Sequence, residues 1–343
     1  GNRPVKVSEL MRLCRLYHKD ISYFLSKKEP TEPSMIFAWR EKNLEVNATE
    51  LNAAIKKVVE DYKLLEDLNN ESIEATDFIL PPDKEVKSYE ESEKLANEII
   101  KEYGLGYRPG ANLANIMENE FGIRIIYYDL SDYGSGVTII DESDSPTVII
   151  NRLDVPGRRN FDLAHELFHI LTSNIYPLSK LDDYESNPED KVEKLANKFA
   201  ASFLMPADYL LREFKKRKKG SSISFIDIIS LAIHFEVSTS SLLWRLKYLL
   251  NIDSSKIEEL LKSDNLKRLD NEARKGKKAP ALKFSQRFVR LGLQSLKDGK
   301  ISKGRFCDIF EISRAEFTKF IETFGFLEEY IYSDEIEIDH SRC

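Results

Sequence analysis

Residues 160–169 read Asn160-Phe161-Asp162-Leu163-Ala164-His165-Glu166-Leu167-Phe168-His169. This stretch contains the pattern H-E-x-x-H in an apolar, helix-forming context. At about 3.6 residues per turn, His165 and His169 lie one above the other on the same helix face. Two imidazoles stacked in this way can both reach one Zn²⁺ ion. Glu166 follows the first histidine directly, so it can approach a water molecule at the metal without being a ligand, as a general base requires.

The opposite face of the same helix carries Leu163, Leu167 and Ile170. These side chains would bury the helix against a core and hold the histidines still. The alternative is an amphipathic helix with two incidental histidines. The chain has only 5 histidines in total, which favours the metal-binding interpretation.

A third protein ligand is required because catalytic zinc takes three of them and keeps one position open. The segment 193–206 predicts a second helix, with Leu195, Phe199 and Phe203 spaced to face a core. Glu193 lies in the first turn of this helix. Its spacing alone leaves it open whether Glu193 is a ligand or a solvated charge among lysines.

The two motifs together resemble those of the ImmA/IrrE family of metallopeptidases. Residues 158–161, R-R-N-F, lead into A-H-E-L-F-H, and E-x-x-A-N-x-F-A-A-x-x-L-M-P follows in the expected order. The resemblance implies that His165, His169 and Glu193 bind the metal and that Glu166 is the catalytic base. Two imidazoles and one carboxylate suit Zn²⁺, with Mn²⁺ as the next candidate.

Other residues are weaker candidates for the site. A second group that stabilises the oxyanion is usual in such enzymes, and the sequence offers Tyr184, Tyr209 and Arg159 without deciding between them. His234 lies in an apolar stretch, so we expect it to pack in the core rather than bind metal.

Three short runs of β-branched and aromatic residues, 124–128, 136–140 and 146–151, precede the histidine motif. Turn residues separate them, which predicts an antiparallel meander. In the resemblance, its last strand flanks the metal and could pair with an extended substrate by strand addition. Residues 89–120 carry helical patterning that is interrupted at 104–106. The predicted fold class is therefore α+β, mostly helical, with a small antiparallel sheet beside the H-E-x-x-H helix, as in a minimal gluzincin, and further helical units at both ends.

Composition describes a soluble globular protein. The chain has 343 residues, of which 42% are hydrophobic and 32% charged, so more than one domain is expected. No apolar run approaches the roughly 18 residues of a membrane span, and no signal peptide is apparent. The three scattered cysteines make neither a disulfide framework nor a thiolate metal site, which fits a cytoplasmic location. The formal net charge of −7 argues against a general nucleic-acid-coating surface but leaves room for a local basic patch.

Four consecutive segments are predicted along the chain. Residues 1–26 resemble the end of an XRE-type helix-turn-helix domain, although a plain two-helix cap would show the same apolar stripe. Residues 27–82 are expected to be a helical connector; its long amphipathic helix, 43–68, would be a spacer, a dimerisation surface or a packing element. Residues 83–262 would form the metallopeptidase domain, and residues 263–343 a linker with a small C-terminal helical unit.

Two basic runs, 215–219 and 266–283, are candidates for nucleic-acid contact, although such runs are more often solvated. The second run, with its glycine and proline, predicts a flexible linker. Residues 284–325 then predict a small helical unit in which a turn at 299–302 leads into a capped helix. The acidic tail, 328–340, could be an edge strand or a pseudosubstrate.

The leading hypothesis is a cytoplasmic metallo-endopeptidase of regulatory type. The resemblance implies that it cuts a helix-turn-helix repressor or an antitoxin in a stress or mobile-element response. We expect its activity to be gated by a partner, with a nucleic-acid effector and a homodimer as further possibilities. One alternative is a DNA-binding transcription regulator whose metal site is sensory or structural; another is an inactive protease that acts as a scaffold. The intact Glu166 favours the enzyme, because a structural site has no use for a base.

Overall fold

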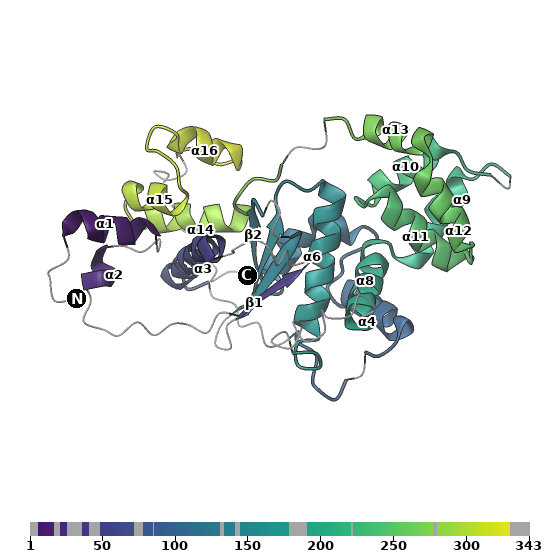
Figure 1. Cartoon of the computed structure of the whole chain (residues 1–343), viewed down its shortest axis with the longest axis horizontal. Coiled ribbons are helices and arrows are strands. Elements are labelled where there is room, and N and C mark those ends of the chain that lie inside the picture. The colour runs from purple at the N-terminus through teal and green to yellow at the C-terminus, as the bar shows by residue number, and fades with distance from the viewer. Residues whose placement is uncertain are drawn as a thin grey trace, which may run out of the picture. The chain divides into compact units, whose positions relative to one another are not determined.

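The computed structural model describes residues 6–16, 21–25, 36–40, 49–71, 78–84, 86–130, 134–140, 145–177, 191–220, 222–276 and 280–329 (Figure 1). These residues form two units. The terminal unit contains α1 (Val7–Leu16), α2 (Ile21–Leu25), α3 (Thr49–Asn69), α14 (Gln286–Lys297), α15 (Lys303–Ile309) and α16 (Phe317–Thr323). The central unit contains β1 and all elements from α4 to α13.

The sheet of the central unit comprises β1 (Ile36–Arg40), β2 (Arg124–Tyr128), β3 (Gly136–Ile140) and β4 (Thr147–Asn151) in the order β1-β3-β4-β2. β3 pairs antiparallel with β1 and with β4, whereas β2 pairs parallel with β4. The prediction of an antiparallel meander is therefore wrong: the sheet is mixed, and β4 inserts between β2 and β3. All five residues of β4 are buried, as expected of a central strand whose apolar run is covered on both faces.

This strand order corrects two further predictions. β4 is paired on both edges, so it has no edge to offer an extended substrate; β1 and β2 are the outer strands. The predicted helical connector is wrong at residues 36–40, which form β1. Short β-branched runs specify a strand but not its neighbours, because the neighbours are chosen by long-range packing.

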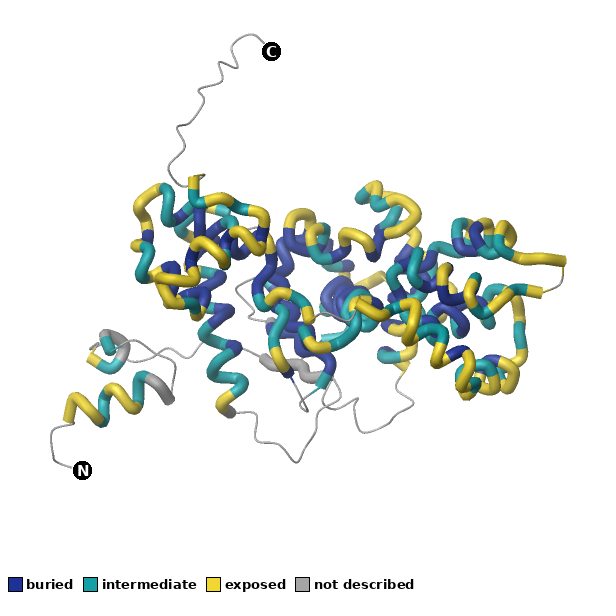
Figure 2. Tube along the Cα trace, turned by 90° about the horizontal axis from the view of Figure 1, so that it is seen from above, coloured by how far each residue is buried: buried dark blue, intermediate teal, exposed yellow. Residues whose placement is uncertain are grey.

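Helices of the central unit cover the sheet in successive layers (Figure 1). α6 (Pro156–Leu171) packs against β4 and α8 (Lys191–Leu204), and α8 packs in turn against α4 (Tyr89–Glu102). Pro156 occupies the first turn of α6, where its missing N–H would have no helical partner in any case. Phe168 of α6 meets Phe199 of α8 with 5.6 Å between ring centroids, inside a continuous buried core (Figure 2). The α+β prediction is confirmed.

The helical patterning predicted for residues 89–120 is confirmed as α4, the 3₁₀-helix η1 (Pro109–Asn112) and α5 (Leu113–Asn119). Ser88 and Glu91 form a reciprocal capping box at the start of α4. The predicted interruption is also found. Gly104 and Gly106 have φ angles of +60° and +69°, a left-handed conformation that favours glycine.

The end of the central unit is formed by α9 (Ala207–Arg217), α10 (Phe225–His234), α11 (Thr239–Leu250), α12 (Ser254–Lys262) and α13 (Asp264–Ala273). α13 corrects the prediction of a flexible linker from residue 266. Ser263 caps the helix and Leu266 is buried, while Asp270 accepts a hydrogen bond of 2.7 Å from Thr239. The basic composition of this stretch comes from the exposed face of an amphipathic helix, and composition alone does not distinguish that face from a linker. Residues 277–279 of the basic run lie outside the described residues.

In the terminal unit, α3 confirms the predicted long helix from Thr49 onward; residues 43–48 lie outside the described part. Its apolar stripe packs against α14, where the Tyr62 and Phe288 rings stack with 4.3 Å between centroids. The predicted turn into a capped helix is confirmed. Gly299 has a φ of +68°, and Ser302 caps α15 by accepting a hydrogen bond from the Arg305 backbone N–H.

α1 and α2 are helices, but their origin in a helix-turn-helix domain stays a prediction, as do the boundaries of the four segments. Residues 330–343, which include most of the acidic tail, lie outside the described residues. Within the described part of the chain no single helix could span a membrane, and α10 with α11 meets the length and composition requirement only as a pair bent by 99°.

Candidate metal centre

α6 places two histidines on one face of the helix. Both side chains are buried, and their Nε2 atoms lie 3.0 Å from each other. This closeness follows directly from the four-residue spacing, which is about one helical turn. His165 and His169 therefore present two imidazole nitrogens to one point in space.

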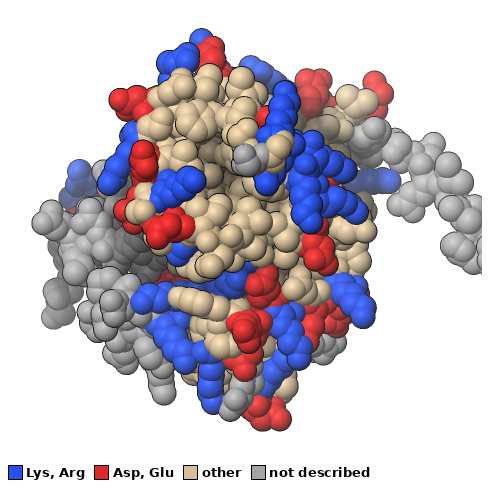
Figure 3. Space-filling model, turned by 90° about the vertical axis from the view of Figure 1, so that its right-hand side faces the viewer, with Lys and Arg blue, Asp and Glu red and all other residues tan. Residues whose placement is uncertain are grey.

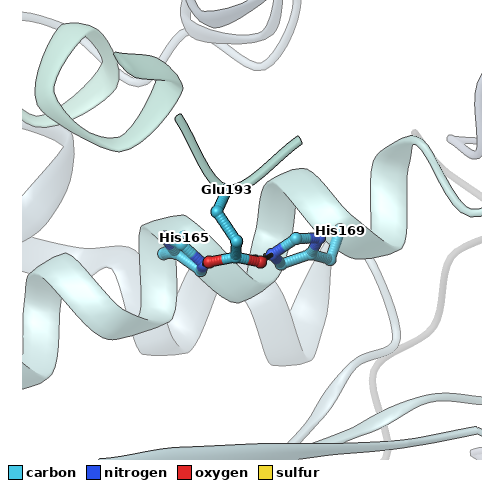
Figure 4. A group of neighbouring side chains, drawn as sticks. All are labelled: His165, His169 and Glu193. Carbon is cyan, nitrogen blue, oxygen red and sulfur yellow. Dashed lines mark hydrogen bonds and ion pairs between the residues drawn. The ribbon is translucent and has the colours of Figure 1, made fainter. Parts of the chain in front are cut away.

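α8 supplies the third group. Glu193 reaches between the two histidines and directs one carboxylate oxygen to each ring (Figure 4). Its Oε2 lies 3.1 Å from His165 Nε2 and its Oε1 lies 3.0 Å from His169 Nε2. Burial alone would raise the pKa of Glu193, but the hydrogen bonds and charges of the two imidazoles outweigh it and hold that pKa well below its usual value.

The three side chains offer the donor set of a divalent metal site. One ligand atom from each of His165, His169 and Glu193 lies within 4.8 Å of the others, the one such group found in the described residues. Two imidazole nitrogens and one carboxylate oxygen fit Zn²⁺ and leave a fourth position for a water or a substrate. The structure thus brings together all three residues that the sequence named as ligands.

Asn197 orients the first histidine. Its Oδ1 lies 3.1 Å from His165 Nδ1. Because an amide oxygen only accepts hydrogen bonds, Nδ1 must carry the proton, and Nε2 keeps its lone pair for a metal. Asn197 follows Glu193 by four residues, so both lie on the same face of α8. The sequence contained this signal in the A-N of its second motif, but the role of Asn197 was not predicted.

The general base predicted at Glu166 lies beside these ligands, on the same helix and almost fully buried. Thr138 of β3 donates a hydrogen bond of 2.6 Å from its Oγ1 to Glu166 Oε2. Gly136 lies on the other side, where a Cβ would stand 3.9 Å from Glu166 Oε1 and only 3.2 Å from the Ile149 carbonyl oxygen. Thr138 of β3 therefore fixes Glu166 Oε2 by a hydrogen bond. Gly136 of the same strand has no side chain and leaves space beside Glu166 Oε1. Neither Thr138 nor Gly136 was predicted, because their role depends on the packing of β3 against α6.

The candidates for the oxyanion-stabilising group have other partners. Tyr184 lies outside the described residues. The Tyr209 hydroxyl lies 3.0 Å from His234 Nε2, and the His234 ring packs on Phe235, in keeping with the predicted packing role of His234. Arg159 donates from Nη1 to the Arg152 and Asp154 carbonyl oxygens ahead of α6, and burial lowers its pKa. The structure places neither Tyr209 nor Arg159 in contact with the three ligands.

The basic run at 215–219 is partly neutralised. Glu213 accepts contacts of 2.6 Å from Lys216 and 2.8 Å from Arg217, and these hydrogen bonds lower the pKa of Glu213 to about 2. Figure 3, which faces the end of the unit where α9–α13 lie, shows basic and acidic side chains intermixed around an uncharged area. That face lacks the continuous basic stripe typical of a nucleic-acid interface.

Comparison with known proteins agrees with this geometry. Residues 118–247 match peptidase family M78, described as the IrrE N-terminal-like domain. The chain is also 30% identical over 155 residues to the radiation response metalloprotease IrrE of Deinococcus deserti. That match covers 43% of this chain and 51% of the Deinococcus protein, so the chain spans about half the length of this relative.

Among solved structures, a Mycobacterium tuberculosis transcriptional regulator is similar at 21% identity and a TM-score of 0.36. The similarity covers 56% of this chain and 51% of that one. A TM-score this low does not establish a shared fold over the aligned length, so no role follows from the second protein. The matched family segment, in contrast, contains α6 and α8 and with them all four candidate site residues.

Proposed function

Because residues 118–247 match the IrrE N-terminal-like peptidase domain, we propose that this chain is a zinc-dependent endopeptidase that cuts a specific protein substrate. One observation carries the proposal. Glu166 lies one residue from His165 and is fixed by Thr138, beside a converging group of two histidines and one glutamate. A base placed next to a set of metal ligands is what metal-assisted hydrolysis of a peptide bond requires.

The metal would activate the water and the peptide carbonyl, and side chains of the protein would hold the metal and transfer the proton. When bound by His165, His169 and Glu193, Zn²⁺ would polarise a peptide carbonyl and lower the pKa of a water molecule to about 7. Glu166 accepts the proton of the attacking water and returns it to the amine nitrogen that leaves. Thr138 holds Glu166 Oε2, so Oε1 is the oxygen that carries this proton. Asn197 keeps His165 in the tautomer that a ligand must have.

The proposed substrate is a helix-turn-helix repressor or an antitoxin. Two features support a regulatory protease over a digestive one: the base and two of the ligands are buried, and the relative from Deinococcus deserti is named for a radiation response. Burial restricts access to the reacting groups, so cleavage would require a substrate that fits. A nucleic-acid effector and a homodimer remain predictions from the sequence.

A DNA-binding regulator with a structural metal site is the competing proposal. A structural site uses four closed ligands and needs no base. Glu166 is buried and hydrogen-bonded at the ligands without being one of them, an arrangement that serves proton transfer. This contrast favours the peptidase.

The experiment is a cleavage assay with the zinc-loaded chain. Purified helix-turn-helix repressors, antitoxins and casein serve as substrates, and mass spectrometry identifies the products. We expect one repressor or antitoxin to be cut at one site, casein to stay intact, and cleavage to stop with a chelator and return with zinc. Parallel reactions with single-stranded DNA at about 50 and 200 mM salt test the nucleic-acid effector, whose binding would weaken steeply at the higher salt. Cleavage that persists after the metal has been removed would overturn the proposal.

A further inference from the structure

The strand beside the catalytic base carries another segment of the same chain along its outer edge. β1 pairs antiparallel with β3, and Ala38 lies directly opposite Thr138 in the register. Thr138 is the residue whose hydroxyl holds Glu166 Oε2 over 2.6 Å. Figure 1 shows β1 in purple beside the teal strands of the sheet. The backbone of β1 therefore passes one strand spacing, about 4.8 Å, from the residue that contacts the base.

An extended polypeptide could pair with this sheet in three places, which differ in their distance from the base. Because the strand order is β1-β3-β4-β2, a strand added outside β1 lies two spacings from β3, and one added outside β2 lies three. These distances are about 10 and 14 Å. The outer edge of β2 is also partly taken, since the Tyr127 N–H donates to the Lys283 carbonyl oxygen over 3.2 Å.

The third place is the one that β1 itself holds. Reacting groups must approach to about 3–3.5 Å, which a polypeptide two or three strands away from β3 does not achieve. A polypeptide paired directly with β3 runs past Thr138 and so past the oxygen atoms of Glu166. Of the three places, this one suits a substrate, and in the structure β1 fills it.

β1 is held to the sheet by pairing rather than by a hairpin. α3, α4, α5 and β2 lie between β1 and β3 along the chain. β3, β4 and β2 pair with one another without β1. β1 can consequently leave the edge of β3 while the rest of the sheet, the base and the metal ligands stay in place.

Exchange of β1 for a substrate changes few interactions. A polypeptide in the same place offers β3 the same backbone hydrogen bonds, so their number stays nearly constant. The advantage of β1 is that it is tethered, which gives it an effective concentration on the order of millimolar. A generic polypeptide at lower concentration competes poorly. A specific partner that makes further contacts elsewhere on the protein competes well.

We propose that β1 is an internal inhibitor: it occupies the substrate's place on β3 and must leave before a polypeptide can be cut. The inference rests on the proposed function, because it concerns access to the same peptidase site. It adds a physical reason for restricted activity, namely competition between the chain's own strand and the substrate for one sheet edge.

A reversible disulfide between β1 and β3 tests the proposal. Ile36 and Ile140 are directly opposite, and such residues have Cα atoms about 4.5–5.5 Å apart, within the span of a disulfide. The host is the zinc-loaded full chain, with its 3 cysteines replaced by Cys14→Ser, Cys307→Ala and Cys343→Ser. In this host, Ile36→Cys with Ile140→Cys should lose cleavage of the panel substrate when oxidised and regain it when reduced.

A second disulfide provides the matched control. Ile139→Cys with Thr147→Cys, in the same host, joins β3 to β4, two strands that need not separate. Its oxidised and reduced forms should therefore cut the substrate at the same rate. The zinc content of every form is measured alongside, so that a loss of cleavage is not mistaken for a loss of metal.

Displacement of β1 can also be measured without cleavage. The host is then the zinc-loaded chain carrying Glu166→Gln, and the probe is a fluorescein-labelled peptide with the sequence of residues 35–42, Met-Ile-Phe-Ala-Trp-Arg-Glu-Lys. Phe37→Pro with Ala38→Pro in this host should release β1. Successive N–H groups of a strand point to opposite edges, so one of the two prolines removes a donor to β3.

Fluorescence anisotropy reports the binding of this peptide. We expect it to bind the proline variant at least about tenfold more tightly than the host, because the tethered competitor has left the edge of β3. A peptide that carries the same two prolines should not bind, since it cannot pair with β3 either.

Two results would overturn the inference: equal cleavage by the oxidised and reduced forms of the chain that joins β1 to β3, or equal affinity of the peptide for the proline variant and its host. Failure of the proposed function looks different. The zinc-loaded chain would then cut nothing in either redox state, while peptide binding would still respond to the prolines.

Discussion

The two units each bury a cluster of charged and polar side chains between two helices, and the clusters are built on different plans. Between α3 and α14, Arg287 donates from Nη1 to Glu66 and to the Tyr62 hydroxyl, and from Nη2 over 2.9 Å to the Glu71 carbonyl oxygen. Arg287 and Glu66 are both almost fully buried. This cluster contains a cation and an anion that neutralise each other, and its hydrogen-bonding groups point at complementary partners.

Between α6 and α8, by contrast, the two histidines and Glu193 direct three lone-pair donors at a single point. In their neutral form the two imidazoles, together with the carboxylate, suit a cation from outside the chain. Burial of charge therefore does not by itself mark a functional site. The α6–α8 cluster differs from the other in that three side chains direct ligand atoms at one point, as a metal ion requires.

Removing two of the three metal-ligand side chains should have the largest effect, which is the loss of zinc binding. The double change His165→Ala with His169→Ala deletes two of the three ligands, so stoichiometric zinc binding should be abolished. Elemental analysis after dialysis against zinc is expected to give about one ion per wild-type chain and essentially none for the variant. A variant that still held one zinc per chain would show that the metal binds elsewhere.

Breaking the buried ion pair of Arg287 and Glu66 between α3 and α14 should destabilise the protein and leave metal binding intact. Arg287→Met leaves Glu66 buried without its cation, which costs about 3–5 kcal/mol when one partner of a buried pair is removed. Hydrogen exchange of α3 and α14 amides should accelerate correspondingly, while zinc content stays at the wild-type level. The matched control is Arg290→Met on the same helix, a half-exposed partner of Glu71 that should cost about 0–1 kcal/mol. Equal exchange rates in the two variants would contradict the comparison.

Removing the hydrogen-bond partner of His165 should lower the affinity for metal by an intermediate amount. Asn197→Ala removes the group that fixes the tautomer of His165, and loss of such an outer contact typically lowers metal affinity by about 10–100-fold. Competition with a zinc-sensitive dye measures the change. Asn115→Ala, on α5, removes an exposed contact with Asn112 of η1 and serves as the control. If both variants bound zinc as the wild type does, Asn197 would have no part in the site.

The smallest expected effect concerns pH. The hydrogen bond from Arg290 lowers the pKa of Glu71 below its usual 4.5, so the folded state favours the charged carboxylate. The pair therefore stabilises the protein above pH 4.5 and loses this contribution as the pH falls through the lowered pKa of the folded state. Melting temperatures of wild type and Glu71→Gln should differ slightly at pH 6, and the difference should shrink as the pH falls through the lowered pKa of Glu71, because its carboxylate is then neutralised. A difference that grows toward low pH would contradict the sign.

Features that depend on local spacing could be predicted from the sequence. His165 and His169 share a face because they are one helical turn apart, and the apolar periodicity of both helices fixed which side faces the core. Glu193 required the family resemblance as well, since its spacing within α8 left its role open. The long helix α3 and the cap at Ser302 were predictable for the same local reasons.

Features that depend on contacts between distant segments could not be predicted. The insertion of β4 between β2 and β3 is decided by burial of the whole sheet. Thr138 has a role only because β3 packs beside Glu166. α13 was mistaken for a linker because its basic residues are visible in the composition and its single buried Leu266 is not.

The most direct test of the peptidase assignment is Glu166→Gln, which preserves the shape and all three ligands but removes the base. The zinc content of the variant and its cleavage of the substrate found in the panel are measured side by side with wild type. We expect equal zinc and a loss of cleavage of about 10²–10⁴-fold, the usual contribution of a general base. Full cleavage by a variant that holds the same zinc would contradict it.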